Sequence, residues 1–245
     1  TNKNKLVTLS NDLYKPQNSY ITSGDAQIPI YGPTHRLDVG GAIGNFWGYK
    51  VIDIDSDGKW IYESPETGKA VAYDDFAKVD ENKMIIGNGL PKFYLSWNNS
   101  IRYKNFDFAV TMRGAFGYEI LNFERMYYEN TKTHQLYNRL KTAYDPIFGK
   151  AVLNNDLDLE YNSYYIEKGD HWKIDNITLG YTFNTKNWKY IDRLRIYAST
   201  LNTFVFTKYK GTDPEVSSTG LAPGNDLPNK YPTVRTFTFG LNISF

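Results

Sequence analysis

The chain has 245 residues, and its 28 basic and 27 acidic side chains leave a formal net charge of +1 at pH 7. Such a balance gives no long-range field to gather nucleic acid or acidic substrates, so we expect no nucleic-acid partner. The sequence contains no cysteine, which excludes disulfides, thiolate metal sites and cysteine nucleophiles. Aromatic residues make up 16% of the sequence, among them 21 Tyr, and this share favours β-structure.

The N-terminal part of the chain has the weakest periodicity. Residues 1–10 predict the end of a strand that runs through Leu6 and Thr8. Residues 11–89 are rich in Gly, Pro, Asp and Asn, which indicates a long structured loop. No stretch comes near the roughly 20 consecutive apolar residues of a membrane-spanning helix. The mean hydropathy of −0.54 still allows a membrane protein, because a barrel strand turns half of its side chains to water.

An acidic run within this predicted loop resembles the beginning of a calcium-binding loop. Asp53, Asp55, Asp57 and Gly58 have the D-x-D-x-D-G spacing of such a loop. Its twelfth position holds Ser64, where a calcium loop has a bidentate Glu. A solvated Asp/Gly turn is the alternative, and the missing Glu favours it. We therefore predict no metal site.

Two segments of alternating polarity come next and predict a β-hairpin. In residues 92–103 the apolar or aromatic positions are Phe93, Leu95, Trp97, Ile101 and Tyr103. After Lys104 and Asn105 the parity reverses, and in residues 106–116 one face holds Phe106, Phe108, Val110, Met112 and Phe116. Alternation with period two is typical of a strand with one apolar and one polar face.

The segment after this hairpin predicts one short helix. Ile120, Phe123 and Tyr127 have the spacing of one helical face. Three more alternating segments then occupy residues 172–183, 193–207 and 233–245, and each predicts a strand.

The last of these strands has the clearest pattern. Its apolar positions are Phe237, Phe239, Leu241, Ile243 and Phe245. We predict that Phe239 and Leu241 face lipid and that Thr238 faces the opposite side.

Three features favour a transmembrane barrel over a β-sandwich. The alternating runs span about 11 to 15 residues, whereas strands of globular proteins cluster near about 5 or 6. Short connections, 104–105 and 184–192, alternate with long ones, 117–170 and 208–232, as in outer-membrane barrels. Aromatic rings recur near the strand ends, where interfacial girdles lie. The sequence therefore predicts an all-β fold, a transmembrane antiparallel β-barrel.

Six short motifs occur in order along the chain. They are G-N-F-W-G-Y-K at 44–50, I-G-N-G-L-P-K-F at 86–93, Y-K-N-F-D at 103–107, I-T-L-G-Y at 177–181, Y-K-G-T-D-P-E at 209–215 and Y-P-T-V-R at 231–235. Together they resemble the SusC/RagA family of TonB-dependent outer-membrane transporters. The chain departs from the family at Thr203, usually Leu, and at Asp175, usually basic. Neither departure disturbs the barrel, because both lie at strand ends or in the lumen-facing register.

The resemblance implies energy-driven import of nutrients across the outer membrane of a Gram-negative bacterium. The cargo of this family is usually an oligosaccharide and sometimes a peptide. The TonB–ExbB–ExbD complex pulls on a plug from the periplasm, and a SusD-like surface lipoprotein caps the external loops. We expect the chain to supply the C-terminal five or six strands of a barrel of about 22, with the plug and TonB box outside it and the C-terminus in the periplasm. We expect no enzymatic activity and no cofactor.

Sugar recognition needs flat rings for stacking, with hydrogen-bonding groups beside them. The candidates in the predicted external loops are Trp47, Trp60, Tyr118, Asn122, Tyr127, Tyr128 and Asn130. Packing of these rings within the loops is the alternative, and it is favoured for any single residue. His35, His134 and His171 lack metal-ligand spacing, and no nucleophile is suggested beside them.

Two other classes of protein remain open at this point. A passive porin would have the same strands without a plug or a TonB box. A β-rich glycan-binding or hydrolytic module would be monodisperse without detergent.

Overall fold

The computed structural model describes residues 1–10, 15, 19–132, 138–228 and 230–245. It divides into two compact units, and the chain passes repeatedly from one to the other. The loop unit comprises Thr1–Lys92, Gly117–Gly169 and Tyr209–Lys230. The sheet unit comprises Phe93–Phe116, Asp170–Lys208 and Tyr231–Phe245.

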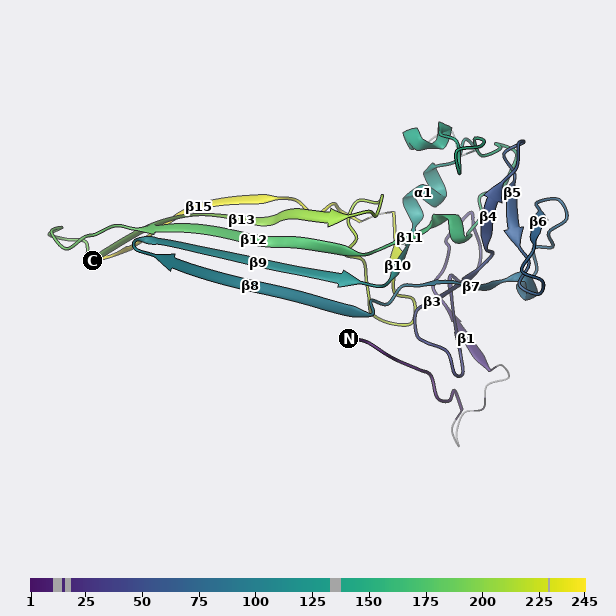
Figure 1. The fold of residues 1–245 in the computed structure, drawn as a ribbon, viewed down its shortest axis with the longest axis horizontal. Coiled ribbons are helices and arrows are strands. Elements are labelled where there is room, and N and C mark those ends of the chain that lie inside the picture. The colour runs from purple at the N-terminus through teal and green to yellow at the C-terminus, as the bar shows by residue number, and fades with distance from the viewer. Residues whose placement is uncertain (11–14, 16–18, 133–137, 229) are drawn as a thin grey trace. The chain divides into compact units, whose positions relative to one another are not determined.

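The sheet unit is a five-stranded antiparallel sheet (Figure 1). Its strands are β8 (Phe93–Tyr103), β9 (Phe106–Phe116), β12 (His171–Thr182), β13 (Arg193–Thr207) and β15 (Thr236–Ser244), in the spatial order β15-β13-β12-β9-β8. The all-β prediction is confirmed. The predicted hairpin turns at Lys104, whose φ of 52° is the left-handed conformation that a tight hairpin turn requires.

A β-bulge interrupts β12 at Asp175. The pairing of β12 with both neighbouring strands shifts between Ile174 and Asn176. The extra residue returns the next apolar side chain, Ile177, to the face that Trp172 and Ile174 occupy. The bulge therefore keeps one face of the sheet apolar although the sequence changes parity.

The described residues of the loop unit form three small sheets, a short helix and three turns of 3-10 helix. The first sheet has β1 (Tyr20–Ser23), β2 (His35–Asp38), β3 (Asn45–Gly48) and β7 (Met84–Asn88). The others are β4 (Val51–Ile54), β5 (Trp60–Glu63) and β6 (Ala70–Ala72), and β11 (Ile166–Lys168), β10 (Glu119–Asn122) and β14 (Asn225–Asp226). The helices are α1 (Phe123–Tyr128), η1 (Asp80–Asn82), η2 (Lys141–Tyr144) and η3 (Ser163–Tyr165). None of the helices in the described residues has the length and apolarity to cross a bilayer.

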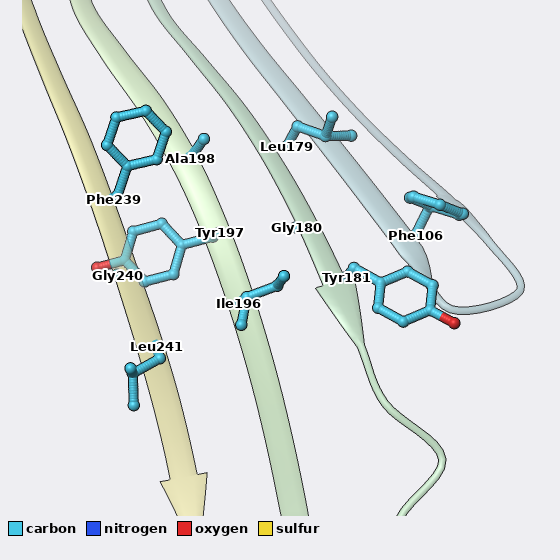
Figure 2. Close-up of a pocket in the computed structure, with 10 residues that line it drawn as sticks. All are labelled: Phe106, Leu179, Gly180, Tyr181, Ile196, Tyr197, Ala198, Phe239, Gly240 and Leu241. Atoms are coloured by element: carbon cyan, nitrogen blue, oxygen red, sulfur yellow. The ribbon is translucent and has the colours of Figure 1, made fainter.

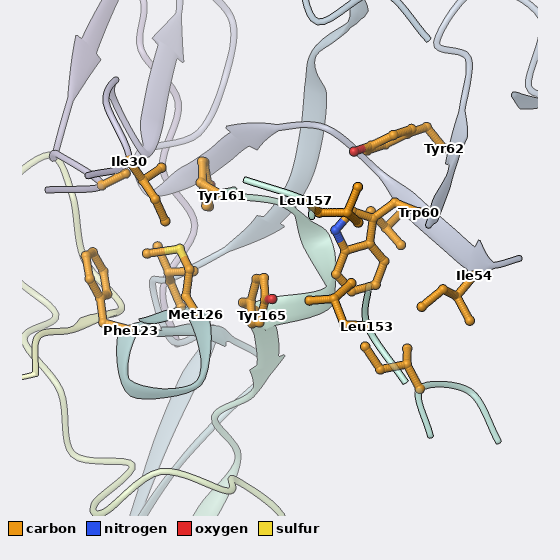
Figure 3. Packing of buried hydrophobic residues seen from close by; sticks show 14 of the residues in the cluster. Ile30, Ile54, Trp60, Tyr62, Phe123, Met126, Leu153, Leu157, Tyr161 and Tyr165 are labelled. Atoms are coloured by element: carbon orange, nitrogen blue, oxygen red, sulfur yellow. The ribbon is translucent and has the colours of Figure 1, made fainter. Parts of the chain in front are cut away.

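The loop unit has a hydrophobic core of its own, rich in aromatic rings (Figure 3). Trp60 packs against Tyr164 with the ring centroids 5.1 Å apart. Tyr62 stacks on Phe76 at 4.2 Å, and both rings are buried. Burying a large aromatic side chain contributes roughly 1.5–3 kcal/mol, so these rings stabilise a region without long strands or helices.

The N-terminal half of the loop unit differs in detail from the sequence prediction. Residues 1–10 form no strand, although Leu6 exchanges two backbone hydrogen bonds with the segment at Gly40 and Gly41. The region predicted as one loop, 11–89, contains β1 to β7, while its residues 11–14 and 16–18 lie outside the described residues.

The helix predicted around Phe123 is present. It begins after Asn122, whose side chain accepts a hydrogen bond from the Arg125 backbone N–H at 3.1 Å and so caps the first turn. Ile120, which the helical spacing included, lies in β10 instead.

Candidate functional site: a two-faced sheet and a folded loop unit

One face of the sheet unit, called here the apolar face, is continuous across all five strands. The register aligns Tyr103, Phe106, Tyr181, Ile196 and Leu241 in one row, and Ile101, Phe108, Leu179, Ala198 and Phe239 in the next. Most of these side chains are exposed; Phe239 is 82% exposed and Leu241 62%. An apolar surface of this extent marks a membrane or protein contact.

The opposite face is polar and carries an ion pair that spans three strands. The register aligns Asp107, Gly180, Tyr197 and Gly240. The Arg195 guanidinium donates to Asp107 at 2.9 and 2.5 Å, and a Cβ on Gly180 would lie 2.4 Å from that guanidinium. Because Gly180 has no side chain, Arg195 can cross β12 to reach β9.

The two ends of the sheet differ in their connections. The turns 104–105 and 183–192 lie at one end, the short-turn end, as does the end of β15, since Arg193 pairs with Ser244. The long connections leave from the opposite end.

Aromatic rings gather at both ends. At the short-turn end Phe106 contacts Tyr181 with the ring centroids 4.8 Å apart. At the opposite end Phe93 stacks on Phe116 at 5.2 Å. The 11 residues of β8 between these bands cover about 36 Å at a rise of about 3.3 Å, and a strand tilted by about 40° would then span the apolar band of about 25 Å seen in outer-membrane barrels.

Two of the ring residues predicted to contact sugar are buried. Trp60 is 2% exposed, within the core of the loop unit. Tyr118 is 3% exposed and donates its hydroxyl hydrogen to the Pro214 carbonyl oxygen at 2.8 Å. Both rings contribute to packing, the alternative that the sequence already favoured.

The two predicted amides are also buried and engaged. Asn122 caps α1 and donates to Glu167 at 3.2 Å. Asn130 accepts a hydrogen bond from the Lys132 backbone N–H at 2.6 Å.

The remaining three predicted residues are half-buried. Tyr127 and Tyr128 lie on α1 with their ring centroids 6.2 Å apart. Burial raises the pKa of Tyr127 to about 12, and its hydroxyl group donates to the Ala26 carbonyl oxygen. Trp47 lies on β3 beneath the Arg36 guanidinium, 4.3 Å from the ring centroid. In the described part of the chain no aromatic contact joins Trp47 to the two tyrosines.

The acidic run at 53–58 is the turn of the β4–β5 hairpin. Asp55 accepts hydrogen bonds from the backbone N–H groups of Asp57 at 3.0 Å and Lys59 at 2.8 Å. A side-chain hydrogen bond from Lys150 lowers the pKa of Asp53. Within the described ranges no group of three or more His, Asp or Glu side chains could hold a metal ion.

A buried ion cluster in the loop unit was not predicted. Arg125 of α1 contacts Glu129 at 2.5 Å and Glu167 of β11 at 2.6 Å, and the Tyr164 ring lies 4.8 Å from its guanidinium carbon. Burial alone would lower the pKa of Arg125, but hydrogen bonds to the carboxylates outweigh it and raise that pKa. The spacing of Arg125 and Glu129 suggests a helical pair, but nothing local to the sequence indicates Glu167.

His35 is 1% exposed and has both ring nitrogens hydrogen-bonded. Nε2 donates to the Pro223 carbonyl oxygen at 2.9 Å, so Nδ1 accepts from the Thr34 hydroxyl group at 2.8 Å. Burial lowers the pKa of His35 to about 4. His171 is also buried, and His134 lies outside the described residues.

The loop unit should therefore lose stability in mild acid. The unfolded chain takes up a proton at His35 near pH 6.5 and the folded one only near pH 4, so stability falls as the pH drops between these values. The loss should approach about 3 kcal/mol. Hydrogen exchange of the β2 amides in the full-length protein, corrected for intrinsic rates, measures it. His35→Gln, which can make both hydrogen bonds, should lose less; an equal loss in this variant would contradict the assignment.

No family model matches the chain. TonB-dependent receptor P3 of Formosa agariphila is 29% identical over 276 residues, covering 100% of this chain and 26% of that protein. TonB-dependent receptor SusC of Bacteroides thetaiotaomicron is 35% identical over 60% of this chain and 14% of that protein. TonB-dependent receptor P39 of Formosa agariphila is 31% identical over 67% of this chain and 17% of that protein.

Solved structures of the RagAB peptide importer have the same fold. The chain of the "closed-closed" state aligns with a TM-score of 0.75 and 18% identity over 94% of this chain and 25% of that one. The "open-open" state gives a TM-score of 0.72.

The relatives and the sheet agree on the class of protein. The matches to SusC and the P receptors cover between 14% and 26% of those proteins, so the chain spans about a quarter of their length or less. The two-faced antiparallel sheet is the architecture of their transmembrane barrels. This chain belongs to the SusC-like TonB-dependent receptors.

Proposed function

We propose that the protein to which this chain belongs imports nutrients across the outer membrane of a Gram-negative bacterium, driven by the TonB–ExbB–ExbD complex. The apolar face, exposed on five adjacent strands and backed by a polar face with ion pairs, carries the proposal. Such a sheet is stable where lipid covers one side and water the other. The likeness to TonB-dependent receptors supports the energy source, which would act through a plug outside this chain.

The proposed orientation follows from the connections. Outer-membrane barrels have short periplasmic turns and long external loops. The turns 104–105 and 183–192, and with them the end of β15, would then lie in the periplasm. The long connections that build the loop unit would be external, where a SusD-like lipoprotein would cap them.

The proposed cargo is an oligosaccharide, with a peptide as the second candidate. The similarity to SusC supports the first, and the likeness to the RagAB peptide importer supports the second. Of the predicted binding residues, Trp47, Tyr127 and Tyr128 are the ones that are half-buried rather than buried, and a flat ring can stack on a sugar. No chemical bond of the cargo would change, so the proposed protein is a transporter and not an enzyme.

Uptake by cells that carry the full-length protein tests the proposal. Labelled oligosaccharide should enter, and deletion of tonB should abolish entry. Tyr128→Ala should weaken the apparent affinity about tenfold, as the loss of about 1.4 kcal/mol would. Tyr190→Ala, a control at the 73% exposed ring of the short-turn end, should not. Entry that does not require TonB would indicate a passive porin. Entry of labelled peptide but not of oligosaccharide would make the peptide the cargo. Recovery of the protein without detergent would contradict a membrane location.

A further inference from the structure

A groove of about 540 Å³ lies on the apolar face of the sheet unit (Figure 2). Its lining is almost entirely hydrocarbon, with Leu179, Ala198 and Phe239 in one row of the register. Lipid chains would fill such a groove where this face contacts the membrane, as proposed above. A cargo rich in hydroxyl groups needs hydrogen-bonding partners instead, and another cavity, in the loop unit, provides them.

This cavity is a pocket of about 320 Å³ beside β14, called here the β14 pocket. One of its walls follows directly on the motif Y-K-G-T-D-P-E at 209–215. Its volume is at the lower end of the range of about 300–1,000 Å³ typical of ligand pockets, which suits one small ring better than a long chain. The polar lining includes Glu215, Ser217, Asp226 and Lys230, and apolar surface comes from Val216 and Leu227.

The carboxyl group of Asp226 is held in a fixed position in this pocket. Its backbone belongs to β14 and pairs with Asn122 of β10. The Tyr209 hydroxyl group donates to Asp226 Oδ2 at 2.6 Å, whereas Oδ1 lies 3.8 Å from the Lys230 Nζ, too far for a hydrogen bond. Asp226 is 5% exposed, and burial raises its pKa. A ligand hydroxyl group that donates to Oδ1 would offset part of the cost of burying this carboxyl group.

The Lys230 ammonium group is also held by the fold. It donates to the backbone carbonyl oxygens of Asp213 at 3.1 Å and Glu215 at 2.9 Å. An ammonium group has three N–H donors, so the third can point toward Asp226. A hydroxyl oxygen about 2.8 Å from both groups would accept from Lys230 and donate to Asp226 Oδ1. The pair is therefore suited to a group that is donor and acceptor at once, as a sugar hydroxyl is.

The charges of the lining favour a neutral ligand. Glu215 and Asp226 bring two carboxyl groups, and the ammonium group of Lys230 already lies beside one of them. A ligand with a carboxylate or sulfate group would be repelled by the carboxylates without meeting an unpaired cation. A neutral sugar ring can instead place its C–H groups against Val216 and Leu227, which is 46% exposed.

We propose that the β14 pocket binds one neutral sugar residue of the oligosaccharide cargo, with a hydroxyl group of the sugar between Lys230 and Asp226. The proposal rests on the import of oligosaccharide proposed above. It adds a site to the candidate rings of Trp47, Tyr127 and Tyr128, and it narrows the cargo to oligosaccharides that contain neutral sugars.

Sugar binding by the full-length protein tests this site. The detergent-solubilised protein is applied to a glycan array that carries neutral oligosaccharides beside oligosaccharides with uronate or sulfate groups. We expect binding to neutral oligosaccharides, and calorimetry with the one bound most tightly gives the dissociation constant. Asp226→Asn should raise this constant about tenfold, as the loss of a hydrogen bond to a charged group would. Binding only to the anionic glycans, or to none of the glycans, would overturn the proposal.

Ser217→Leu keeps the test decisive if Asp226→Asn alters the fold. Ser217 is exposed at the pocket, and a leucine side chain there should obstruct it and raise the dissociation constant by about tenfold or more. Thr219→Leu is the matched control, because Thr219 is exposed and lies outside the lining, and its hydroxyl group is 3.2 Å from that of Ser217. Both substitutions thus remove the same hydrogen bond, but Thr219→Leu should leave binding unchanged.

Two results with these variants would contradict the site. One is an unchanged dissociation constant in both Ser217→Leu and Asp226→Asn, and the other is an equal loss of binding in Ser217→Leu and Thr219→Leu. Neither result bears on the dependence of uptake on TonB, which the transport experiment measures separately.

Discussion

Phe239→Arg should destabilise the membrane-inserted protein by about 2 to 4 kcal/mol, because it places a cation on the lipid-facing side of β15 near the middle of the strand. Leu241→Arg should cost less, since Leu241 lies two positions nearer the short-turn end, where headgroups and water come within reach of a long side chain. The free energy of unfolding can be measured by urea titration of the full-length protein in lipid vesicles under reversible conditions.

Thr238→Arg is the matched control for this prediction. Thr238 lies between Phe237 and Phe239 on the same strand but points to the polar face, opposite Ser199. The new guanidinium there would meet polar neighbours, so the cost should stay well below that of Phe239→Arg. Equal costs at the two positions would refute the assignment of the faces.

Arg125→Met should be the most damaging substitution in the loop unit, at about 3 to 5 kcal/mol. The side chains of Arg125, Glu129 and Glu167 are 7%, 6% and 11% exposed, so loss of the guanidinium leaves two buried carboxylates without their cation. Hydrogen exchange of the α1 and β11 amides in the full-length protein measures the loss. Adding Glu129→Gln and Glu167→Gln to Arg125→Met should restore part of the stability, because it removes the uncompensated charges.

Lys132→Met provides the control for a cation at the surface. Lys132 pairs with Asp158 at 2.7 Å, but these side chains are 42% and 88% exposed, and such pairs contribute about 0 to 1 kcal/mol. If Arg125→Met and Lys132→Met lower the free energy of unfolding by the same amount, burial does not determine how much these ion pairs contribute to stability.

The strands of the sheet could be predicted because their information is local. Apolar and polar or small residues alternate within a single strand, as at Phe239 and Gly240. This alternation predicts where the strand lies and which side chains share a face. The bulge at Asp175 could not be predicted, because it is a property of how β12 pairs with two other strands. Its trace in the sequence is the change of parity between Ile174 and Ile177.

The loop unit depends on contacts between distant segments, and the sequence could not indicate them. In the sequence Trp60 is a candidate for stacking on a sugar. In the fold it packs against Tyr164 and Tyr165, which are far away in the sequence. The residues next to His35 in the sequence do not indicate that it is buried. In the fold it is buried, and it forms a hydrogen bond with the carbonyl oxygen of the distant Pro223. Short strands such as β14 form because a distant segment, here β10, offers backbone hydrogen bonds. Their own sequence has no alternation of apolar and polar residues that would predict a strand.

The chain passes several times between the two units, and this limits the order in which contacts within the loop unit can form. In the loop unit, β10 pairs in parallel with β14 through Leu121 and Asn225, and His35 bonds to Pro223. These contacts cannot form until β8, β9, β12 and β13 have all been synthesised. Closing such long loops is slow, because the entropy cost comes before the stabilising contacts. The loop unit should therefore acquire its protection against proteases late, and only in chains that extend beyond residue 225.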